Sequence, residues 1–250
     1  MAHSRSRAST LHVLEAAIPE FFGTFLFTVF GMAASSAASG VGLNGAFGNG
    51  IALTTILYML SNDEGSGKLN AAISLAVFLT GQTSISKFFT ELAMQFAGGV
   101  AGGAFIKALV PSPKSTCFVP AASNTALFAW ELLGTFVLIG VVFSTSGRKY
   151  RTTAPLAIGL ALFTAAQAAG PYTGGCFNPV RYLANIGVGC SVRKGGYYIG
   201  AELLAAVAVV FVHYIQQWVS NEEGIRQHDP QLGVDMSAPL VSKRASERYP

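Results

Sequence analysis

Two asparagines each stand at the beginning of a short apolar stretch. Asn70 precedes residues 71–80, and Asn178 precedes residues 179–188. Asparagine is a favoured N-cap, and proline suits the first helical position because the N–H that it lacks would be unpaired there anyway. Helix starts carry partial positive charge and asparagine amides donate hydrogen bonds, so this pair suits a neutral molecule that accepts through oxygen. The predicted first turns contain Ala71, Ala72, Pro179 and Val180.

Three ionisable side chains interrupt stretches that are otherwise nearly free of charge. Arg181 follows Asn178 by three residues and therefore lies on the same side of the predicted short helix. Glu20 and Glu131 occupy the same position in two copies of a Glu-x-x-Gly-Thr-Phe segment. An ionisable residue inside a membrane segment is a candidate functional residue by default. Arg181 thus either faces a lumen or pairs with loop carbonyls, and the two carboxylates either couple to protons or serve a structural task.

The composition of the 250-residue chain favours a membrane protein. Charged residues make up 11%, against about 25% in an ordinary soluble domain. Apolar residues make up 51%, and the mean hydropathy is +0.48. Such a chain lacks the polar surface needed to coat a water-soluble globule of this size. The 16 lysines and arginines are spread over tails and short loops, so we expect no nucleic-acid partner despite the net charge of +4.

The sequence offers no set of residues that we expect to hold a metal or cofactor, or to catalyse a reaction. The three cysteines, Cys117, Cys176 and Cys190, are too few and too apolar in context to predict a disulfide framework or a zinc site. Of the four histidines, only His213 falls in an apolar span. Metal-binding His-Glu-x-x-His and glycine-rich phosphate-loop motifs are absent from the sequence, so we do not expect an enzyme.

Six nearly uncharged windows are long enough, as helix, to cross about 30 Å of hydrocarbon. They are residues 18–38, 44–60, 88–110, 126–143, 154–169 and 197–219. The two stretches that follow Asn70 and Asn178 reach only about halfway, so we interpret them as re-entrant half-helices. The predicted fold is an all-α membrane protein with six transmembrane helices and two half-helices. Residues 1–14 and 221–250 are predicted to be polar tails, the second disordered, on either side of a membrane domain at 15–220.

The two halves of the membrane domain repeat each other. Gly48 follows Glu20 by 28 positions, and Gly159 follows Glu131 by 28 positions, so the register holds between the halves. The half-repeats, about 15–110 and 126–220, each contain three crossings and must insert with opposite topology. The half-helices then enter from opposite faces and meet near the midplane. Most lysines and arginines outside them fall on the side of the two termini, which predicts that both termini are cytoplasmic.

These features resemble the aquaporin, or major intrinsic protein, family over about residues 15–220. The resemblance is carried by two asparagine-initiated half-helices in register on an inverted repeat, with the doubled Glu-x-x-Gly-Thr-Phe, Gln95-x-x-Gly98, residues 154–159 and residues 172–175. It implies an aquaporin-like channel domain with one pore per chain, assembled as a homotetramer in a lipid bilayer, with the plasma membrane favoured over an internal one. Water that accepts from Asn70 and Asn178 together would then be unable to relay protons.

The resemblance also implies roles for individual residues. Arg181 would form the extracellular constriction, with the remaining filter positions at Phe47, Ala166 and Gly175. Glu20 and Glu131 would accept N–H groups from the loops before the half-helices. The small Ala166 and Gly175 predict a wide aperture, whereas Tyr182 and Ile186 replace the residues usual in glycerol-conducting relatives. We therefore expect water as the main solute, with glycerol, urea or ammonia as further solutes, and the alternative is an aquaglyceroporin-type channel mainly for glycerol, urea or ammonia.

The chain departs from the family pattern at three positions. Ala71 replaces the first proline, Val180 replaces the usual alanine, and Lys68 stands where histidine is common. Losing the proline removes preorganisation but no hydrogen bond, so the first half-helix is expected to persist. Lys68 either lines the cytoplasmic vestibule and repels cations, or extends toward water without a role. A coupled secondary transporter and a low-flux structural membrane protein remain the alternatives to a channel.

Overall fold

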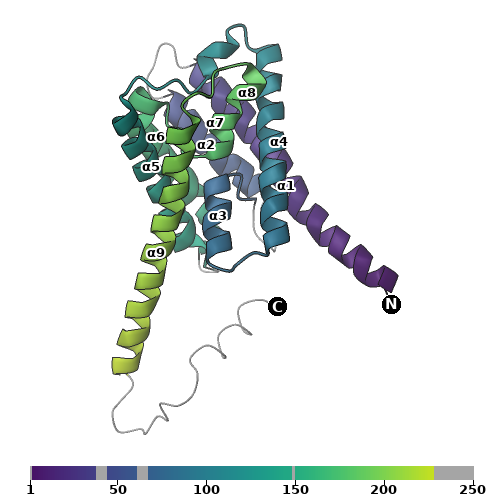
Figure 1. Cartoon of the computed structure of the whole chain (residues 1–250), viewed down its shortest axis with the longest axis vertical. Helices are drawn as coiled ribbons and strands as arrows, with labels where there is room; N and C mark the ends of the chain where they lie inside the picture. Colours follow the sequence, from purple (N-terminus) through teal and green to yellow (C-terminus); the bar gives the residue numbers. More distant parts are fainter. Residues whose placement is uncertain (1, 38–43, 61–66, 148–149, 228–250) are drawn as a thin grey trace. The chain divides into compact units, whose positions relative to one another are not determined.

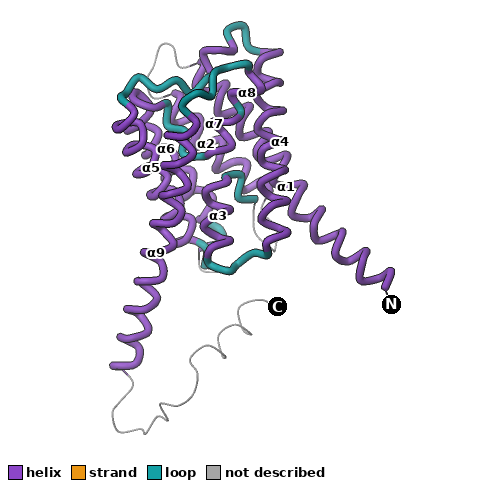
Figure 2. The backbone as a smooth tube through the Cα atoms, viewed as in Figure 1, coloured by secondary structure: helices purple, strands orange, loops and turns teal. Residues whose placement is uncertain are grey.

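The computed structural model describes residues 2–37, 44–60, 67–147 and 150–227, and the regular structure within these ranges is helical (Figure 2). Five helices contain segments long and apolar enough to cross a membrane, and a sixth apolar helix has 17 residues. The long helices are α1 Ala2–Ala37, α2 Asn44–Leu60, α4 Ile85–Leu109, α5 Asn124–Thr145, α6 Ala154–Thr173 and α9 Gly195–Gln227. The predicted all-α membrane fold is confirmed.

Short helices lie between the long ones. They are α3 Ala71–Leu79, the 3₁₀ helix η1 Pro113–Thr116, α7 Pro179–Leu183 and α8 Asn185–Val188. α3 is the first predicted half-helix. The second is divided into α7 and α8 at Ala184, whose backbone stays in the right-handed helical region. In Figure 1, α3 and α7 lie among the long helices, one toward each end of the bundle.

The chain forms two compact units, residues 1–212 and 213–250, and the second is described as far as Gln227, the end of α9. Both tails contain more helix than the sequence predicts. α1 begins at Ala2, inside the expected 1–14 tail, and α9 continues into the expected 221–250 tail. Extending an existing helix costs less than starting one, and residues 2–18 contain neither glycine nor proline. Residues 228–250 lie outside the described residues.

Glycines allow α2 and α6 to cross closely. A Cβ on Gly50 would lie 2.6 Å from the carbonyl oxygen of Gly159, and a Cβ on Gly159 would overlap the Thr54 hydroxyl. The sequence repeat instead pairs Gly159 with Gly48, which packs against Ala34 of α1. The crossing glycine of α2 therefore comes two residues later than the repeat predicts. Two residues of helix amount to a rotation of about 200°, so α2 presents a different face to the interior than the one expected.

The glycine-rich face of α4 holds both α1 and the second half-helix. A Cβ on Gly102 would lie 2.9 Å from the carbonyl oxygen of Phe25 in α1, and a Cβ on Gly99 would lie 2.8 Å from Cγ1 of Val180 in α7. Small residues at such interfaces let helix backbones approach closely within a membrane. α7 is thereby packed into the interior, together with the asparagine that begins it.

Candidate functional site

The two asparagines meet and exchange hydrogen bonds. Nδ2 of Asn70 donates to the carbonyl oxygen of Phe177 at 2.8 Å, and Nδ2 of Asn178 donates to that of Leu69 at 2.7 Å. Oδ1 of each asparagine caps its own helix by accepting the backbone N–H two residues later, at 2.9 and 3.0 Å. Because an amide nitrogen carries two hydrogens, each asparagine keeps one further N–H to donate.

The first turns of the two half-helices behave alike although their residues differ. α3 begins at Ala71 and α7 at Pro179, and the capping N–H groups come from Ala72 and Val180, which are both buried. The cap depends on the asparagine side chain, which α3 retains. The alanine at the first position of α3 therefore leaves the half-helix intact.

The residues before the two asparagines share an unusual backbone conformation. Leu69 has φ 56° and Phe177 has φ 52°, and both side chains are fully buried. Positive φ is uncommon for residues other than glycine and costs of order 1–3 kcal/mol when imposed by the surroundings. The carbonyls of these two residues accept the reciprocal asparagine bonds. The strained turn is thus what aims each carbonyl at the opposite half of the molecule.

Two buried carboxylates hold these strained turns in place. Oε1 and Oε2 of Glu20 accept the backbone N–H groups of Lys68 and Leu69 at 2.7 and 2.8 Å. Oε1 and Oε2 of Glu131 accept those of Cys176 and Phe177 at 3.2 and 2.8 Å. Each carboxylate lies on a long helix of its own half, α1 or α5, and both are almost completely buried. The geometry therefore gives both glutamates an orienting role in the loops that precede the half-helices.

A second pair of buried carboxylates makes different contacts in the two halves. Oε1 of Glu202 accepts the backbone N–H of Asn178 at 2.8 Å, whereas Oε1 of Glu91 pairs with Nζ of Lys68. The side chain of Lys68 is 18% exposed and that of Glu91 is 2% exposed, so little water surrounds the pair. Lys68 is therefore neither an isolated cation in the vestibule nor a chain extended freely into water. Its charge is balanced two residues before Asn70.

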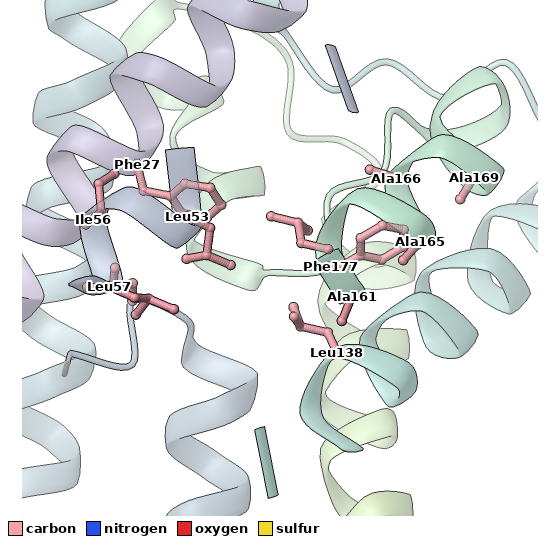
Figure 3. Packing of buried hydrophobic residues seen from close by; sticks show 12 residues of the cluster. Phe27, Leu53, Ile56, Leu57, Leu138, Ala161, Ala165, Ala166, Ala169 and Phe177 are labelled. Atoms are coloured by element: carbon pink, nitrogen blue, oxygen red, sulfur yellow. The ribbon is translucent and has the colours of Figure 1, made fainter. Parts of the chain in front are cut away.

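A cavity of about 110 Å³ lies beside the asparagine pair. Asn70 and Asn178 both line it, and Lys68 lines it together with residues of α3. The remaining walls are mostly apolar, and Figure 3 shows several of these side chains, with Phe27, Leu53 and Leu57 on one side and Leu138 and Phe177 on the other. A water needs roughly 10–15 Å³ measured in this way, so the cavity has room for several waters in contact with the amides.

Arg181 packs against Phe27, one of the side chains that line this cavity. Its Cζ atom is 4.4 Å from the centre of the Phe27 ring, which lines the cavity, and 5.3 Å from that of Phe118. Nη1 donates to Oδ1 of Asn49 in α2. Nε and Nη2 have no hydrogen-bond partner among the described residues, although Arg181 is only 1% exposed. Two buried guanidinium nitrogens, which carry three N–H groups, thus have no acceptor among the described residues.

Two of the other predicted filter residues contact each other, and the third, Phe47, is about half exposed. Gly175 adopts φ 66°, and a Cβ there would lie 3.0 Å from Cα of Ala166, so these two buried positions are in contact. Phe47 is 48% exposed, and its ring centre lies 5.7 Å from that of Phe163. The structure therefore does not bring Phe47 to the group. The reason is the rotation of α2, since Asn49, two residues further along, takes the inward position.

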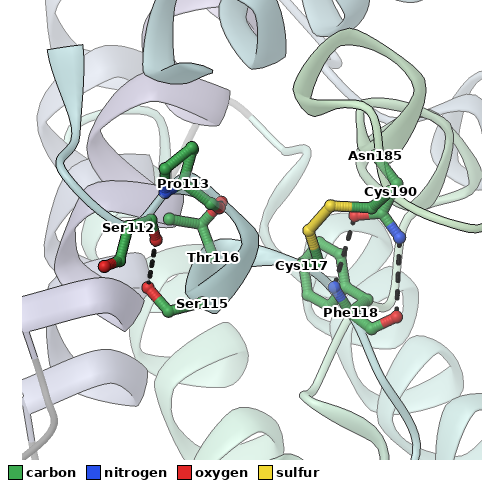
Figure 4. The surroundings of a disulfide bond; sticks show 8 residues. All are labelled: Ser112, Pro113, Ser115, Thr116, Cys117, Phe118, Asn185 and Cys190. Atoms are coloured by element: carbon green, nitrogen blue, oxygen red, sulfur yellow. Dashed lines mark hydrogen bonds between the residues drawn. A yellow bond between two sulfur atoms is a disulfide. The ribbon is translucent and has the colours of Figure 1, made fainter. Parts of the chain in front are cut away.

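The structure also joins two cysteines that the sequence does not pair. Cys117 and Cys190 form a disulfide across 73 residues (Figure 4), which corrects the expectation that these cysteines have no such role. Next to it, the backbone N–H of Phe118 donates to Oδ1 of Asn185 at 3.3 Å. The disulfide therefore fastens the loop that carries Phe118, and Phe118 in turn packs against Arg181.

Sequence reasoning missed Asn49 and the disulfide for different reasons. Asn49 is a polar residue between two glycines in an uncharged span, and this was a usable signal. The repeat arithmetic that selected Gly48 drew attention to Phe47 instead. Cys117 and Cys190 both fall in loops of the same predicted side, which was the available hint of a bond between them.

Comparisons with known proteins agree with this architecture. The sequence model of the major intrinsic protein family matches residues 7–189. Aquaporin PIP1-3 of Arabidopsis thaliana is 31% identical over 191 residues, which span 67% of this chain and 66%, just under two thirds, of that protein. Aquaporin PIP1-1 of the same plant is 30% identical over 234 residues, 80% of each chain.

A solved structure shares the fold. The X-ray structure of the aquaglyceroporin from Plasmodium falciparum superposes with a TM-score of 0.65, covering 80% of this chain and 93% of that one. At 21% identity this likeness bears on the fold alone. With the family model spanning most of the membrane domain and the plant relatives at 30% identity or more, the chain belongs to the major intrinsic protein family.

Proposed function

We propose that this chain is a passive channel for water. The observation that carries the proposal is the reciprocal bonding of Asn70 and Asn178 beside a cavity large enough for several waters. Each amide has one N–H left, and a water oxygen that accepts both must turn its hydrogens outward. The hydrogen-bonded water chain that proton hopping requires is then interrupted at this point.

The walls of the cavity oppose the passage of ions. Removing the hydration shell of an ion in a narrow apolar conduit costs far more than two helix starts return. The lysine that reaches the cavity is paired with Glu91, so it offers no free charge to replace that shell. The conduit is therefore suited to neutral solutes and to flow down a gradient, with no coupling ion.

Arg181, Ala166 and Gly175 are our candidates for the outer constriction. Arg181 supports this role because two of its guanidinium nitrogens have no acceptor in the part of the chain that the structure describes, and because the guanidinium lies over a ring that lines the cavity. The contact between Ala166 and Gly175 supplies a wall without large side chains. Water is the main solute in this proposal, and glycerol, urea and ammonia are secondary solutes because of that small wall.

The proposal includes an orientation. Disulfides persist in oxidising compartments, and the Cys117–Cys190 bond lies in the loops that the distribution of lysine and arginine assigns to the non-cytoplasmic side. These two independent arguments favour cytoplasmic termini, and the plasma-membrane location in the proposal follows from the family resemblance alone. We further propose a homotetramer with one pore per chain, on the basis of the family alone. Chemical crosslinking in native membranes tests the oligomer, and a tag accessible only after permeabilisation tests the orientation.

Stopped-flow light scattering on proteoliposomes tests the central proposal. Vesicles that contain the full chain should shrink faster under an osmotic gradient than protein-free vesicles of the same lipid. Flux should be insensitive to sodium and proton gradients, because a channel has no coupling ion. Water flux equal to that of the lipid background would end the proposal and favour a structural membrane protein. Sodium- or proton-dependent, saturable flux would favour a secondary transporter.

A further inference from the structure

We propose that Asn49 of α2 is a positioning residue that sets the outer constriction by holding the guanidinium of Arg181. This inference rests on the proposed channel function. Asn49 is 7% exposed, and its Oδ1 accepts from Nη1 of Arg181. The bond joins α2 in the first half of the chain to α7 in the second, across 132 residues. It therefore fixes the guanidinium between the two halves, against the Phe27 ring that lines the cavity.

The amide of Asn49 is itself held in one orientation. Its Nδ2 donates toward the carbonyl oxygens of Gly31 and Gly45, at 3.1 and 2.8 Å, and lies 3.1 Å from Oγ of Ser35. All three are possible acceptors, whereas the group facing Oδ1 is a cation that only donates. Reversing the amide would place an NH₂ group against the guanidinium. The surroundings thus require Oδ1 to point at Arg181.

The unpartnered nitrogens of Arg181 show what this arrangement would bind. Unpaired buried donors are costly, so Nε and Nη2 favour a solute that brings an acceptor. Oδ1 of Asn49 is an amide oxygen with two lone pairs, one of which remains for a donor. A water meets both requirements, because its oxygen accepts from the guanidinium while a hydrogen is donated to Oδ1. The constriction is thus matched to a small neutral solute that both accepts and donates.

The packing of α2 explains why Asn49 has this role and Phe47 does not. The close contact of Gly50 with Gly159 fixes the rotation of α2 against α6. With this rotation Asn49 is buried, while Phe47 is 48% exposed and packs edge-on against Phe163. If Gly48 lay against Gly159 in place of Gly50, Phe47 would face the interior and Asn49 would not.

Three variants measured in proteoliposomes test this assignment. Asn49→Ala removes the acceptor and vacates space beside the guanidinium. The ratio of glycerol to water permeability should rise about tenfold. Losing a hydrogen bond to a charged group lowers, by about a factor of ten or more, the population of molecules in which the guanidinium is held in place. Asn49→Asp keeps an acceptor toward Arg181 but places its second oxygen against the carbonyl oxygens of Gly31 and Gly45, so its ratio should rise less than that of Asn49→Ala. Phe47→Ala should leave the ratio unchanged.

A fourth variant disturbs the contact without removing either partner. A Cβ on Gly31 would overlap Oδ1 of Asn49 and lie 2.8 Å from Nη2 of Arg181, so Gly31→Ala must push the two apart. The ratio of glycerol to water permeability should rise at least about fivefold, by the same loss of the held guanidinium. Gly140→Ala is the matched control, because a Cβ there meets no atom within 4 Å. Thermal unfolding in detergent identifies any variant that fails to fold.

The outcomes separate this inference from the function on which it rests. Wild-type protein without water flux contradicts the channel. If wild-type protein conducts while Asn49→Ala and Gly31→Ala both match it, the channel stands and the role of Asn49 is refuted. If the ratio changes in Phe47→Ala but not in Asn49→Ala, then Phe47 and not Asn49 sets the constriction. A ratio in Asn49→Asp that exceeds that of Asn49→Ala would also contradict the proposal, since the retained acceptor would then be irrelevant.

Discussion

Glu131→Gln should weaken the centre of the molecule by an amount that follows from its contacts. The carboxylate accepts two buried backbone N–H groups, those of Cys176 and Phe177, one on each oxygen. Glutamine keeps one oxygen and places an NH₂ group against the other N–H, which is left unsatisfied. An unsatisfied buried donor costs about 1–3 kcal/mol, so we expect the free energy of unfolding to fall by that amount. For a chain of this size, that loss lowers the melting temperature by about 2–12 °C.

The protein carries its own reporter for this measurement. Cys176 is a free buried cysteine, while the other two cysteines of the chain form the disulfide. A thiol-reactive fluorophore in detergent therefore reports exposure of the loop that Glu131 holds. Gln82→Ala serves as the control, because Gln82 is exposed and its side chain contacts only the local Thr80 hydroxyl among the described residues. Its melting temperature should stay within about 1–2 °C of wild type, as is usual for surface changes.

Water permeability provides the second readout for Glu131→Gln. Phe177 holds its positive φ while Glu131 binds its N–H, and its carbonyl accepts from Asn70. With that turn relaxed, the amide loses its fixed direction and permeability should drop. A variant that melts with wild type and conducts water at the wild-type rate would refute the orienting role assigned to Glu131.

Three further predictions concern contacts elsewhere in the chain. Replacing Cys117 and Cys190 by serine should lower the stability followed by tryptophan fluorescence by about 2–4 kcal/mol, the upper figure being the loop-closure value for 73 residues, and an unchanged melting curve would contradict this. Lys68→Met should cost about 2 kcal/mol, below the 3–5 kcal/mol typical of a fully buried pair, and Lys68→Met combined with Glu91→Leu should recover most of it in a double-mutant cycle. Asn178→Asp cannot donate to the opposite carbonyl and should abolish water flux in proteoliposomes, so wild-type flux would argue against the central site.

The half-helices were predictable because their determinants are local. Asn70 and Asn178 cap the turns that follow them, and capping is decided by a side chain and the N–H two residues later. The opposite insertion of the halves followed from an odd number of crossings in each. These arguments need no knowledge of which helices touch.

The rotation of α2 was not predictable in the same way. Gly48 and Gly50 both suit a close crossing, and the repeat favoured the first, whereas the structure pairs Gly50 with Gly159. A shift of two residues exchanges Phe47 for Asn49 at the interior. The choice depends on packing between helices distant in sequence, as does the bond between Cys117 and Cys190.

The exchange of bonds between the two asparagines has a consequence for biosynthesis. The acceptor of the Asn70 amide is the carbonyl of Phe177, 107 residues further along the chain. At about 5–20 residues per second, a ribosome needs about 5–20 s to deliver it. Throughout that interval the first half carries an incomplete centre in the bilayer, where an unsatisfied polar group is costly. Closure of the midpoint is therefore a late event in biogenesis, and a nascent chain stalled before Phe177 should be the form most dependent on the insertion machinery.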